Sequence, residues 1–266
     1  MKNNLLLGFC LLTLSLSVSH IVKATVVEVR TVVGDFQVNL FDDVTPQTVN
    51  NFLDYVNSGA YANNVVHRSV PGFVVQMGGF TYNNAFPLDE VATGAPVVNE
   101  PELSNLRGTI AMAKLSGNPD SATSQFFVNL ENNATVLDPQ NGGFSVFGQV
   151  LGNGMEVVDA IANLSRFNFG GALAELPLRD YSTTDATNNV VPNDDNFVII
   201  TDIVVIDATR VTNSDLNPAS NTLIDSSSEQ PTNPDGGDSS GGGSINIVLL
   251  IGLALIIRLR YLRKTN

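Results

Sequence analysis

Short stretches of alternating apolar and polar residues recur along the chain, separated by turn residues. Residues 25–30 and 36–41 alternate on either side of a Val-Gly-Asp turn, which is the pattern of a β-hairpin. A second hairpin is predicted over residues 65–79, where a Pro-Gly pair separates two apolar runs. Further strands are predicted at residues 108–114, 125–130, 145–150 and 196–207. The pattern predicts a mainly β protein.

Only two segments have the spacing of an amphipathic helix. The first follows Thr45, a good N-cap residue, with Pro46 at the first helical position and Gly59 as a stop. Its apolar residues fall at i, i+3, i+4 and i+7, namely Val49, Phe52, Leu53 and Val56. The second helix is predicted over 153–164. Many short strands with two helices favour an antiparallel barrel or sandwich, and two helices suit the two open ends of a closed barrel.

The remaining segments are predicted to be irregular. Loops are expected over residues 80–107, 131–144 and 165–195. Residues 211–244 are rich in Ser, Asn, Asp, Gly and Pro, which predicts a flexible acidic linker after a folded domain at 25–210.

Both ends of the chain have the composition of targeting segments. Residues 1–24 combine a basic start, an apolar run and a Val-Lys-Ala end, which is typical of a cleaved secretory signal peptide. Residues 245–266 contain about 13 apolar residues and then a basic cluster. They are either a short C-terminal transmembrane anchor or a GlyGly-type sorting tail that is removed. We therefore expect an extracytoplasmic protein of the periplasm or cell envelope, with membrane attachment through this tail as one alternative.

Charge and cysteine content agree with that location. The formal net charge is −13, and several of the basic residues lie in the C-terminal tail. A surface this acidic repels nucleic acid, so we expect no nucleic-acid partner. The single cysteine, Cys10, lies in the signal segment, so the mature domain has no disulfide. We expect a monomer.

The sequence lacks the residues of common catalytic sites. His67 is the only histidine after the signal segment, and we interpret it as a packed structural residue. No Cys/His metal set, phosphate-binding loop or dinucleotide fingerprint occurs. We therefore predict no metal and no cofactor.

One arginine stands out in the apolar hairpin over 65–79. Strand alternation places Arg68 and Gln76 side by side on one face of this hairpin. The guanidinium is either a fixed set of donors beside an apolar surface or a surface group paired with a carboxylate. The pattern alone favours neither.

Four ordered motifs resemble those of cyclophilin-type peptidyl-prolyl isomerases. The hairpin "VVHRSVPGFVVQMGG" is similar to the family's hallmark, and "GTIAMAK" (108–114), "SQFF" (124–127) and "VFGQV" (146–150) follow in the family's order. The resemblance runs from about residue 26 to 206 and is closest to the bacterial periplasmic branch. It implies a closed eight-stranded antiparallel β-barrel capped by two helices.

The resemblance also implies residue roles. Arg68 matches the catalytic arginine, with Gln76 and Phe73 beside it in the catalytic group. The residues that bind the substrate are implied to be Phe73, Val74, Gln76, Ala113, Phe127, Val136, Leu137 and Phe144. Three of these depart from the family pattern. Val74 replaces a common Met, which is a small change, whereas Val136 replaces a common Trp or Phe and Phe144 replaces His or Tyr. The last two changes put rim hydrogen bonds and cyclosporin affinity in doubt.

The implied function is peptidyl-prolyl cis-trans isomerisation during the folding of extracytoplasmic proteins. The partners would be proline-containing unfolded or flexible polypeptides. The alternative is a non-catalytic module, tethered to the envelope, that binds proline peptides. Retention of both Arg68 and Gln76 favours the enzyme, because binding alone needs mainly the apolar pocket.

Overall fold

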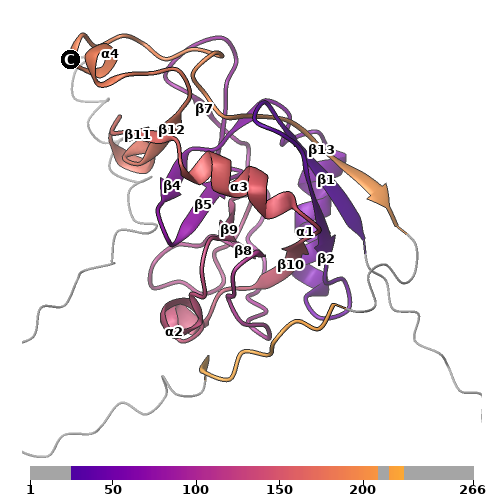
Figure 1. Ribbon diagram of the computed structural model, residues 1–266. Helices are drawn as coiled ribbons and strands as arrows, with labels where there is room; N and C mark the ends of the chain where they lie inside the picture. The colour runs from indigo at the N-terminus through magenta and orange to yellow at the C-terminus, as the bar shows by residue number, and fades with distance from the viewer. Residues whose placement is uncertain (1–24, 209–215, 225–266) are drawn as a thin grey trace, which may run out of the picture.

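Antiparallel strands dominate the structure, a computed structural model in which residues 25–208 and 216–224 are described (Figure 1). Within these residues, eleven strands form one curled sheet. In hydrogen-bonded order they are β4 (Arg68–Val70), β5 (Val74–Met77), β9 (Phe126–Asn129), β8 (Thr109–Met112), β10 (Val146–Val150), β2 (Phe36–Leu40), β1 (Val26–Thr31), β13 (Ile199–Asp207), β3 (Asn64–Val65), β6 (Phe80–Thr81) and β7 (Asp89–Glu90). The prediction of a mainly β fold is confirmed, whereas the closed eight-stranded barrel stays a prediction.

The strands with clear alternation form where the sequence predicts them. The first hairpin pairs Val29 with Phe36, so the Val-Gly-Asp stretch is its turn. The second pairs Arg68 with Gln76 and Val70 with Val74 across the Pro-Gly turn.

The predicted loops contain regular elements that the sequence analysis missed. They are β6, β7, α2 (Ala134–Leu137), η1 (Gln140–Gly142), β11 (Ser165–Phe167), η2 (Gly171–Leu173), β12 (Leu176–Leu178) and α4 (Thr183–Thr187). Each has only two to five residues. Elements this short show no measurable period, and partners distant in the sequence decide their conformation.

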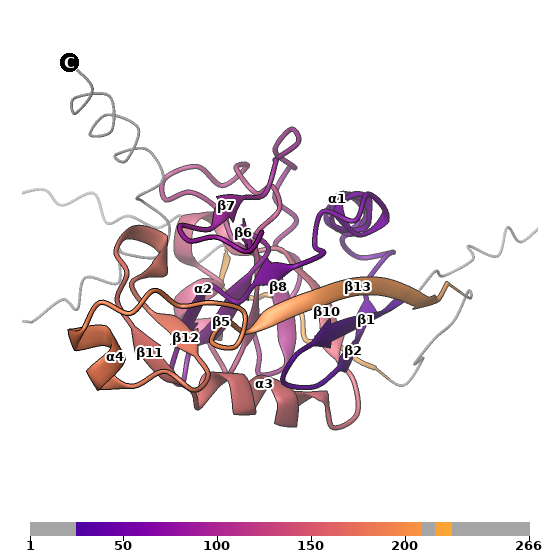
Figure 2. The same ribbon diagram turned by 90° about the horizontal axis from the view of Figure 1, so that it is seen from above.

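Two longer helices lie on opposite sides of the strands, α1 (Pro46–Asn57) and α3 (Gly154–Ala162) (Figure 2). Both match the predicted helices. Thr45 occupies the N-cap position of α1, but its side chain makes no capping bond. The buried carboxylate of Glu100 accepts from the amides of Gln47 and Thr48 instead, at 3.2 and 2.8 Å. An acid at this end also interacts favourably with the helix dipole.

The main core lies between these two helices and the sheet. Phe52 of α1 is fully buried and packs against Tyr61, Phe126 and Phe147, with ring centroids 5.1–5.5 Å apart. Val158 and Ile161 of α3 belong to the same cluster. Both helices therefore fold onto one continuous core.

The segment predicted as the loop 165–195 forms a small unit with its own apolar cluster. Strands β11 and β12 pair, and α4 follows beside them (Figure 1). The cluster combines Leu176, Leu178 and Tyr181 from this segment with Phe197 from the main sheet side. The unit is thus anchored to the main sheet.

Part of the predicted linker packs on the domain. The amide of Ser104 donates to Ala219 O at 2.9 Å, and the amide of Asn221 donates to Glu102 O at 2.8 Å. Leu216 packs against the apolar cluster that contains Leu137. Residues 216–224 therefore extend the folded part past the predicted boundary at 210.

The predicted signal peptide (1–24) and C-terminal tail (245–266) lie outside the described residues. Among the residues that are described, none belongs to a helix with the length and apolar character needed to cross a membrane.

Candidate active site

The candidate site begins at the β4–β5 hairpin, whose register places Arg68 directly opposite Gln76. Arg68 Nη1 donates to Gln76 Oε1 at 3.4 Å. Gln76 Nε2 in turn donates to Gln125 Oε1 at 2.9 Å. The second bond fixes the amide so that its oxygen faces the guanidinium, and the side-by-side placement predicted from alternation is confirmed.

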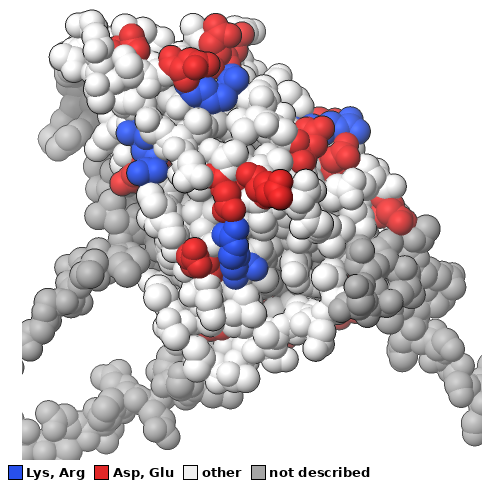
Figure 3. Space-filling model, in the orientation of Figure 1, with Lys and Arg blue, Asp and Glu red and all other residues white. Residues whose placement is uncertain are grey.

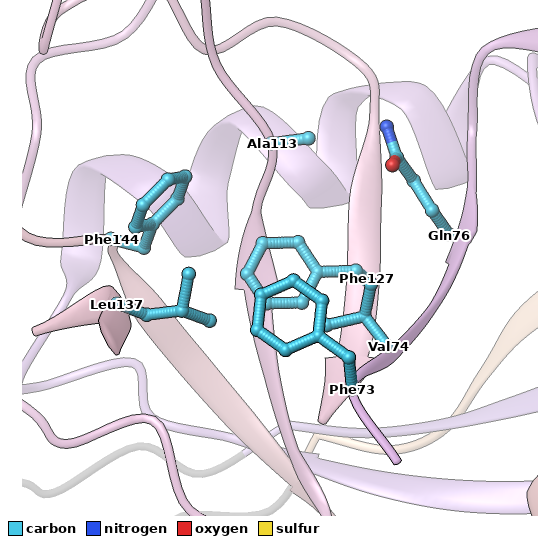
Figure 4. A pocket seen from close by; sticks show the side chains of 7 residues that line it. All are labelled: Phe73, Val74, Gln76, Ala113, Phe127, Leu137 and Phe144. Carbon is cyan, nitrogen blue, oxygen red and sulfur yellow. The ribbon is translucent and has the colours of Figure 1, made fainter. Parts of the chain in front are cut away.

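An apolar pocket lies next to this pair. Seven side chains line it, Phe73, Val74, Gln76, Ala113, Phe127, Leu137 and Phe144. Figure 4 shows Leu137 and Phe144 facing Phe73 and Phe127 across the pocket. The Phe127 and Phe144 rings meet edge to face, with centroids 5.8 Å apart. The adjacent strands β5, β9 and β8 supply the floor, because their order in the sheet brings together Val74 on β5, Phe127 on β9 and Ala113, the residue directly after β8.

The structure thus gathers all but two of the predicted site residues in the pocket lining. Arg68 lies at its edge through the contact with Gln76. Val136 lies in the same short helix, α2, as Leu137, but it is 36% exposed and does not line the pocket. The roles assigned to these residues stay predictions.

Buried polar residues that the sequence analysis missed hold the pocket wall. The Asp138 carboxylate, directly after Leu137, accepts from Ser104 Oγ at 2.5 Å and from the amide and side chain of Asn105, both at 2.9 Å. Asn133 Nδ2 donates to Phe73 O at 2.9 Å. These bonds tie α2 to two distant loops, and isolated Asn and Asp residues in loops give no periodic signal that could have revealed them.

Lys114 fixes the other side of the wall. Its ammonium group donates to Gly143 O and to Asn141 O, the latter at 2.9 Å, and lies 4.9 Å from the centre of the Phe144 ring. Burial lowers the pKa of Lys114 to about 8, an effect that Asp120 partly opposes. The buried Lys114 side chain therefore holds in place the loop that carries Phe144.

Arg68 is partly buried, and few charged groups of the described residues lie near its guanidinium. Burial lowers the pKa of the Arg68 guanidinium, and the negative charge of Glu175 partly opposes that shift. No carboxylate lies within 4 Å of Arg68 in the described part of the chain. The arginine is therefore not locked in an ion pair, which argues against the reading of a paired surface residue.

His67, next to Arg68, is buried and packs edge to face on Phe80, with ring centroids 5.0 Å apart. Burial lowers its pKa to about 3, so the imidazole is neutral near pH 7. This matches the predicted structural role. Across the described residues, no three His, Cys, Asp or Glu side chains are grouped closely enough to hold a metal ion.

The comparisons with known proteins agree with these features. The model of the family described as "cyclophilin type peptidyl-prolyl cis-trans isomerase/CLD" matches residues 26–182. A peptidyl-prolyl cis-trans isomerase of Acinetobacter baylyi is 42% identical over 155 residues, which are 57% of this chain and 79% of the relative.

Two further relatives show comparable similarity. Peptidyl-prolyl cis-trans isomerase A of Dickeya dadantii is 45% identical over 55% of this chain and 76% of its own length. Peptidyl-prolyl cis-trans isomerase B of Escherichia coli is 41% identical over 50% of this chain and 80% of its own length. The matched region includes both the Arg68–Gln76 pair and the pocket, so the predicted enzyme class is confirmed: the chain belongs to the cyclophilin-type peptidyl-prolyl cis-trans isomerase family.

Proposed function

We propose that this enzyme accelerates X-Pro bond rotation in proteins folding outside the cytoplasm, with the pocket holding the proline ring and Arg68 lowering the barrier. The observation that carries the proposal is the placement of a guanidinium beside an apolar pocket, with no carboxylate of the described residues within 4 Å of it.

The physical barrier defines what the site must do. An X-Pro amide resists rotation by roughly 18–20 kcal/mol because of its partial double bond. In the twisted state, resonance is lost and the prolyl nitrogen carries a lone pair. A donor that binds this state more strongly than the planar one accelerates the exchange, and each 1.36 kcal/mol of selective binding gives about a tenfold rate increase.

Different residues bind the proline ring and donate to the twisted amide. The apolar walls of Phe73, Phe127 and Leu137 hold the ring while the preceding carbonyl turns. Arg68 donates to the twisted amide, and Gln76 orients the guanidinium through its fixed oxygen. A donor held in place before reaction needs little reorganisation. This route uses no general acid, general base or nucleophile.

The curled sheet supports the closed barrel of the family. Val66 N donates to Val198 O, while His67 N donates to Gln76 O, at 3.0 and 3.2 Å. One bent segment, residues 64–70, thereby contacts both the β13 side and the β5 side of the sheet. We infer that β3 and β4 act as one strand, which would close a barrel of eight strands.

The decisive test is an NMR exchange assay on an Ala-Pro peptide with Arg68→Ala. We expect the rate enhancement to fall by at least about tenfold, and Arg68→Lys to be impaired too, because an ammonium does not reproduce the planar guanidinium. Arg30→Ala, which removes an exposed arginine on β1, is the matched control. Full activity in a folded Arg68→Ala protein would contradict the mechanism.

The same assay separates the enzyme from the alternative, a tethered module that only binds proline peptides. Such a module would bind the peptide without accelerating its exchange, and Arg68→Ala would change neither property. The enzyme instead loses exchange in Arg68→Ala while the apolar pocket still binds.

The location and the attachment require separate measurements. The signal-like residues 1–24, the acidic cysteine-free domain and the basic end support an extracytoplasmic enzyme of the periplasmic branch. Intact-mass analysis should find a mature chain without residues 1–24. A chain ending at 266 in the membrane fraction would support the anchor, and a C-terminus near 241–244 would support the sorting tail. A cytoplasmic protein that retains residues 1–24 would refute both.

A further inference from the structure

We propose that Arg166 is a positioning residue that holds the Glu175 carboxylate away from Arg68 and thereby keeps the Arg68 guanidinium available to the substrate. The proposal rests on the catalytic role of Arg68 proposed above. It assigns a function to the 165–195 unit, which the isomerisation mechanism does not otherwise use.

The backbone places Glu175 next to β4, the strand that carries Arg68. The amide of Ser69, the neighbour of Arg68 on β4, donates to Glu175 O at 2.9 Å. Strand β12, which begins directly after Glu175, packs along β4. The β11–β12 unit therefore brings one carboxylate to the edge of the site, and the charge of that carboxylate acts on Arg68.

The Glu175 side chain is nevertheless paired elsewhere. Its Oε2 lies 3.7 Å from Arg166 Nε on β11, and the two side chains are 49% and 31% exposed. Basic side chains on the face drawn in Figure 3 generally adjoin acidic ones. Among the described residues, no carboxylate lies within 4 Å of Arg68, Lys114 or Arg179. Lys114 and Arg179 donate to backbone carbonyls instead, whereas the side chain of Arg68 donates only to Gln76.

Arg166 is itself fixed by the end of α3. Its Nη1 donates to Ala162 O at 3.3 Å and to Leu164 O at 3.4 Å. Carbonyls at the C-terminal end of a helix attract cations. Arg166 thus has a fixed position from which it competes with Arg68 for the same carboxylate.

The competition has a direct consequence for catalysis. If Glu175 paired with Arg68, the guanidinium would have to break that ion pair before donating to the substrate. An exposed ion pair is worth about 0.2–1 kcal/mol, so the loss of Arg166 should lower kcat/KM by at most about fivefold. The Arg68–Glu175 ion pair would stabilise the free enzyme, so its loss on substrate binding lowers kcat/KM. A structural defect at the pocket would instead lower activity whether or not residue 175 is charged.

The test compares Arg166→Gln, Glu175→Gln and the double variant in the full chain, by peptide exchange kinetics. We expect Arg166→Gln to lose about 1.5-fold to fivefold in kcat/KM. Glu175→Gln alone should remain close to the unmodified enzyme. The double variant should regain the lost activity, because the competing charge is gone. Arg30→Gln, which breaks the Arg30–Glu28 pair on β1, is the control.

Salt provides an independent readout. Raising the ionic strength from 0.1 to 1 M shortens the screening length from about 10 to about 3 Å. The Arg166→Gln deficit should therefore shrink in 1 M salt. Arg166→Met replaces Arg166→Gln if the latter does not fold, since it keeps an unbranched stem.

The outcomes distinguish the role proposed for Arg166 from the catalytic role proposed for Arg68. Unchanged activity in a folded Arg166 variant, or a double variant that stays impaired, would overturn it. If Arg68→Ala loses exchange in the same experiment, the catalytic role of Arg68 survives that result. If Arg68→Ala keeps full activity, the role of Arg68 fails first and this proposal fails with it.

Discussion

Arg68 and Gln76 lie directly opposite each other on β4 and β5, with the guanidinium Nη1 3.4 Å from the amide oxygen. The bond from Gln76 Nε2 to Gln125, at 2.9 Å, determines which end of the Gln76 amide faces the arginine. A residue two strands away, next to β9, therefore orients the group proposed to act on the substrate.

Gln76→Leu should remove this orientation while keeping the volume of the side chain. We expect kcat/KM for an Ala-Pro peptide to fall by about tenfold, the scale of one hydrogen bond to a charged group. Gln37→Leu, at an exposed position on β2, is the matched control and should be unchanged. Normal exchange rates in folded Gln76→Leu would show that Arg68 needs no such support.

The parts of the fold that the sequence predicts are those with local periodicity. The β4–β5 register follows from alternation around a Pro-Gly turn, and α1 follows from four apolar residues at helical spacing. Resemblance in the motifs then identifies five of the pocket residues, and Leu137 and Phe144 follow from their positions between the motifs. Both kinds of signal lie within short stretches of chain, so they can be read without the three-dimensional structure.

The missed features depend on contacts between distant segments. Glu100 caps α1 from 52 residues away, and Asp138 binds Ser104 across 34 residues. Residues 216–224 have the composition of a linker and still pack on the domain, because backbone bonds such as Ser104 N to Ala219 O depend little on side-chain type. Composition alone cannot reveal such docking.

Val136→Trp tests the departure at the pocket rim. Val136 is 36% exposed near the end of α2, and its side chain has no hydrogen-bonding group. An indole there would supply a donor and apolar surface, so cyclosporin binding should tighten by about 1–2 kcal/mol in calorimetry. Val44→Trp, at an exposed position outside the pocket lining, is the control. Tight binding by the unmodified protein would contradict the prediction.

His67 should make stability depend on pH. The folded protein keeps this imidazole neutral down to a pKa of about 3, whereas the unfolded chain protonates it near 6.5. Between these values the unfolded state binds more protons, so the free energy of unfolding should fall as the pH falls from 6.5 toward 3. The slope from this group is at most about 1.4 kcal/mol per pH unit.

His67→Phe isolates this contribution, because the ring can still pack on Phe80 but cannot titrate. Urea unfolding at pH 7.5 and 4.5 should show a smaller loss of stability in the variant than in the unmodified protein. The surface carboxylates titrate in both proteins and cancel in the comparison. Equal losses in the two would argue that His67 is not held neutral.

Residues 216–224 should stabilise the pocket wall. A chain that ends at residue 208 loses the bonds to Ser104 and Glu102 and the packing of Leu216. It also loses the bond from Asn221 Nδ2 to Asp138 O, at 3.2 Å, directly behind Leu137. At about 1 kcal/mol for each hydrogen bond, this truncation should lower the free energy of unfolding by about 2–4 kcal/mol relative to a chain that ends at 224.

Point variants show whether the contacts themselves matter. In the full chain, Asn221→Ala should lower the free energy of unfolding by about 1 kcal/mol, because Asp138 O loses a donor. Thr222→Ala, at the next and exposed position, should have no measurable effect in urea unfolding. Because Asp138 follows Leu137 directly, Asn221→Ala should also raise KM for the Ala-Pro peptide more than it lowers kcat. Equal stability of the chains ending at 208 and 224 would show that this segment only rests on the surface.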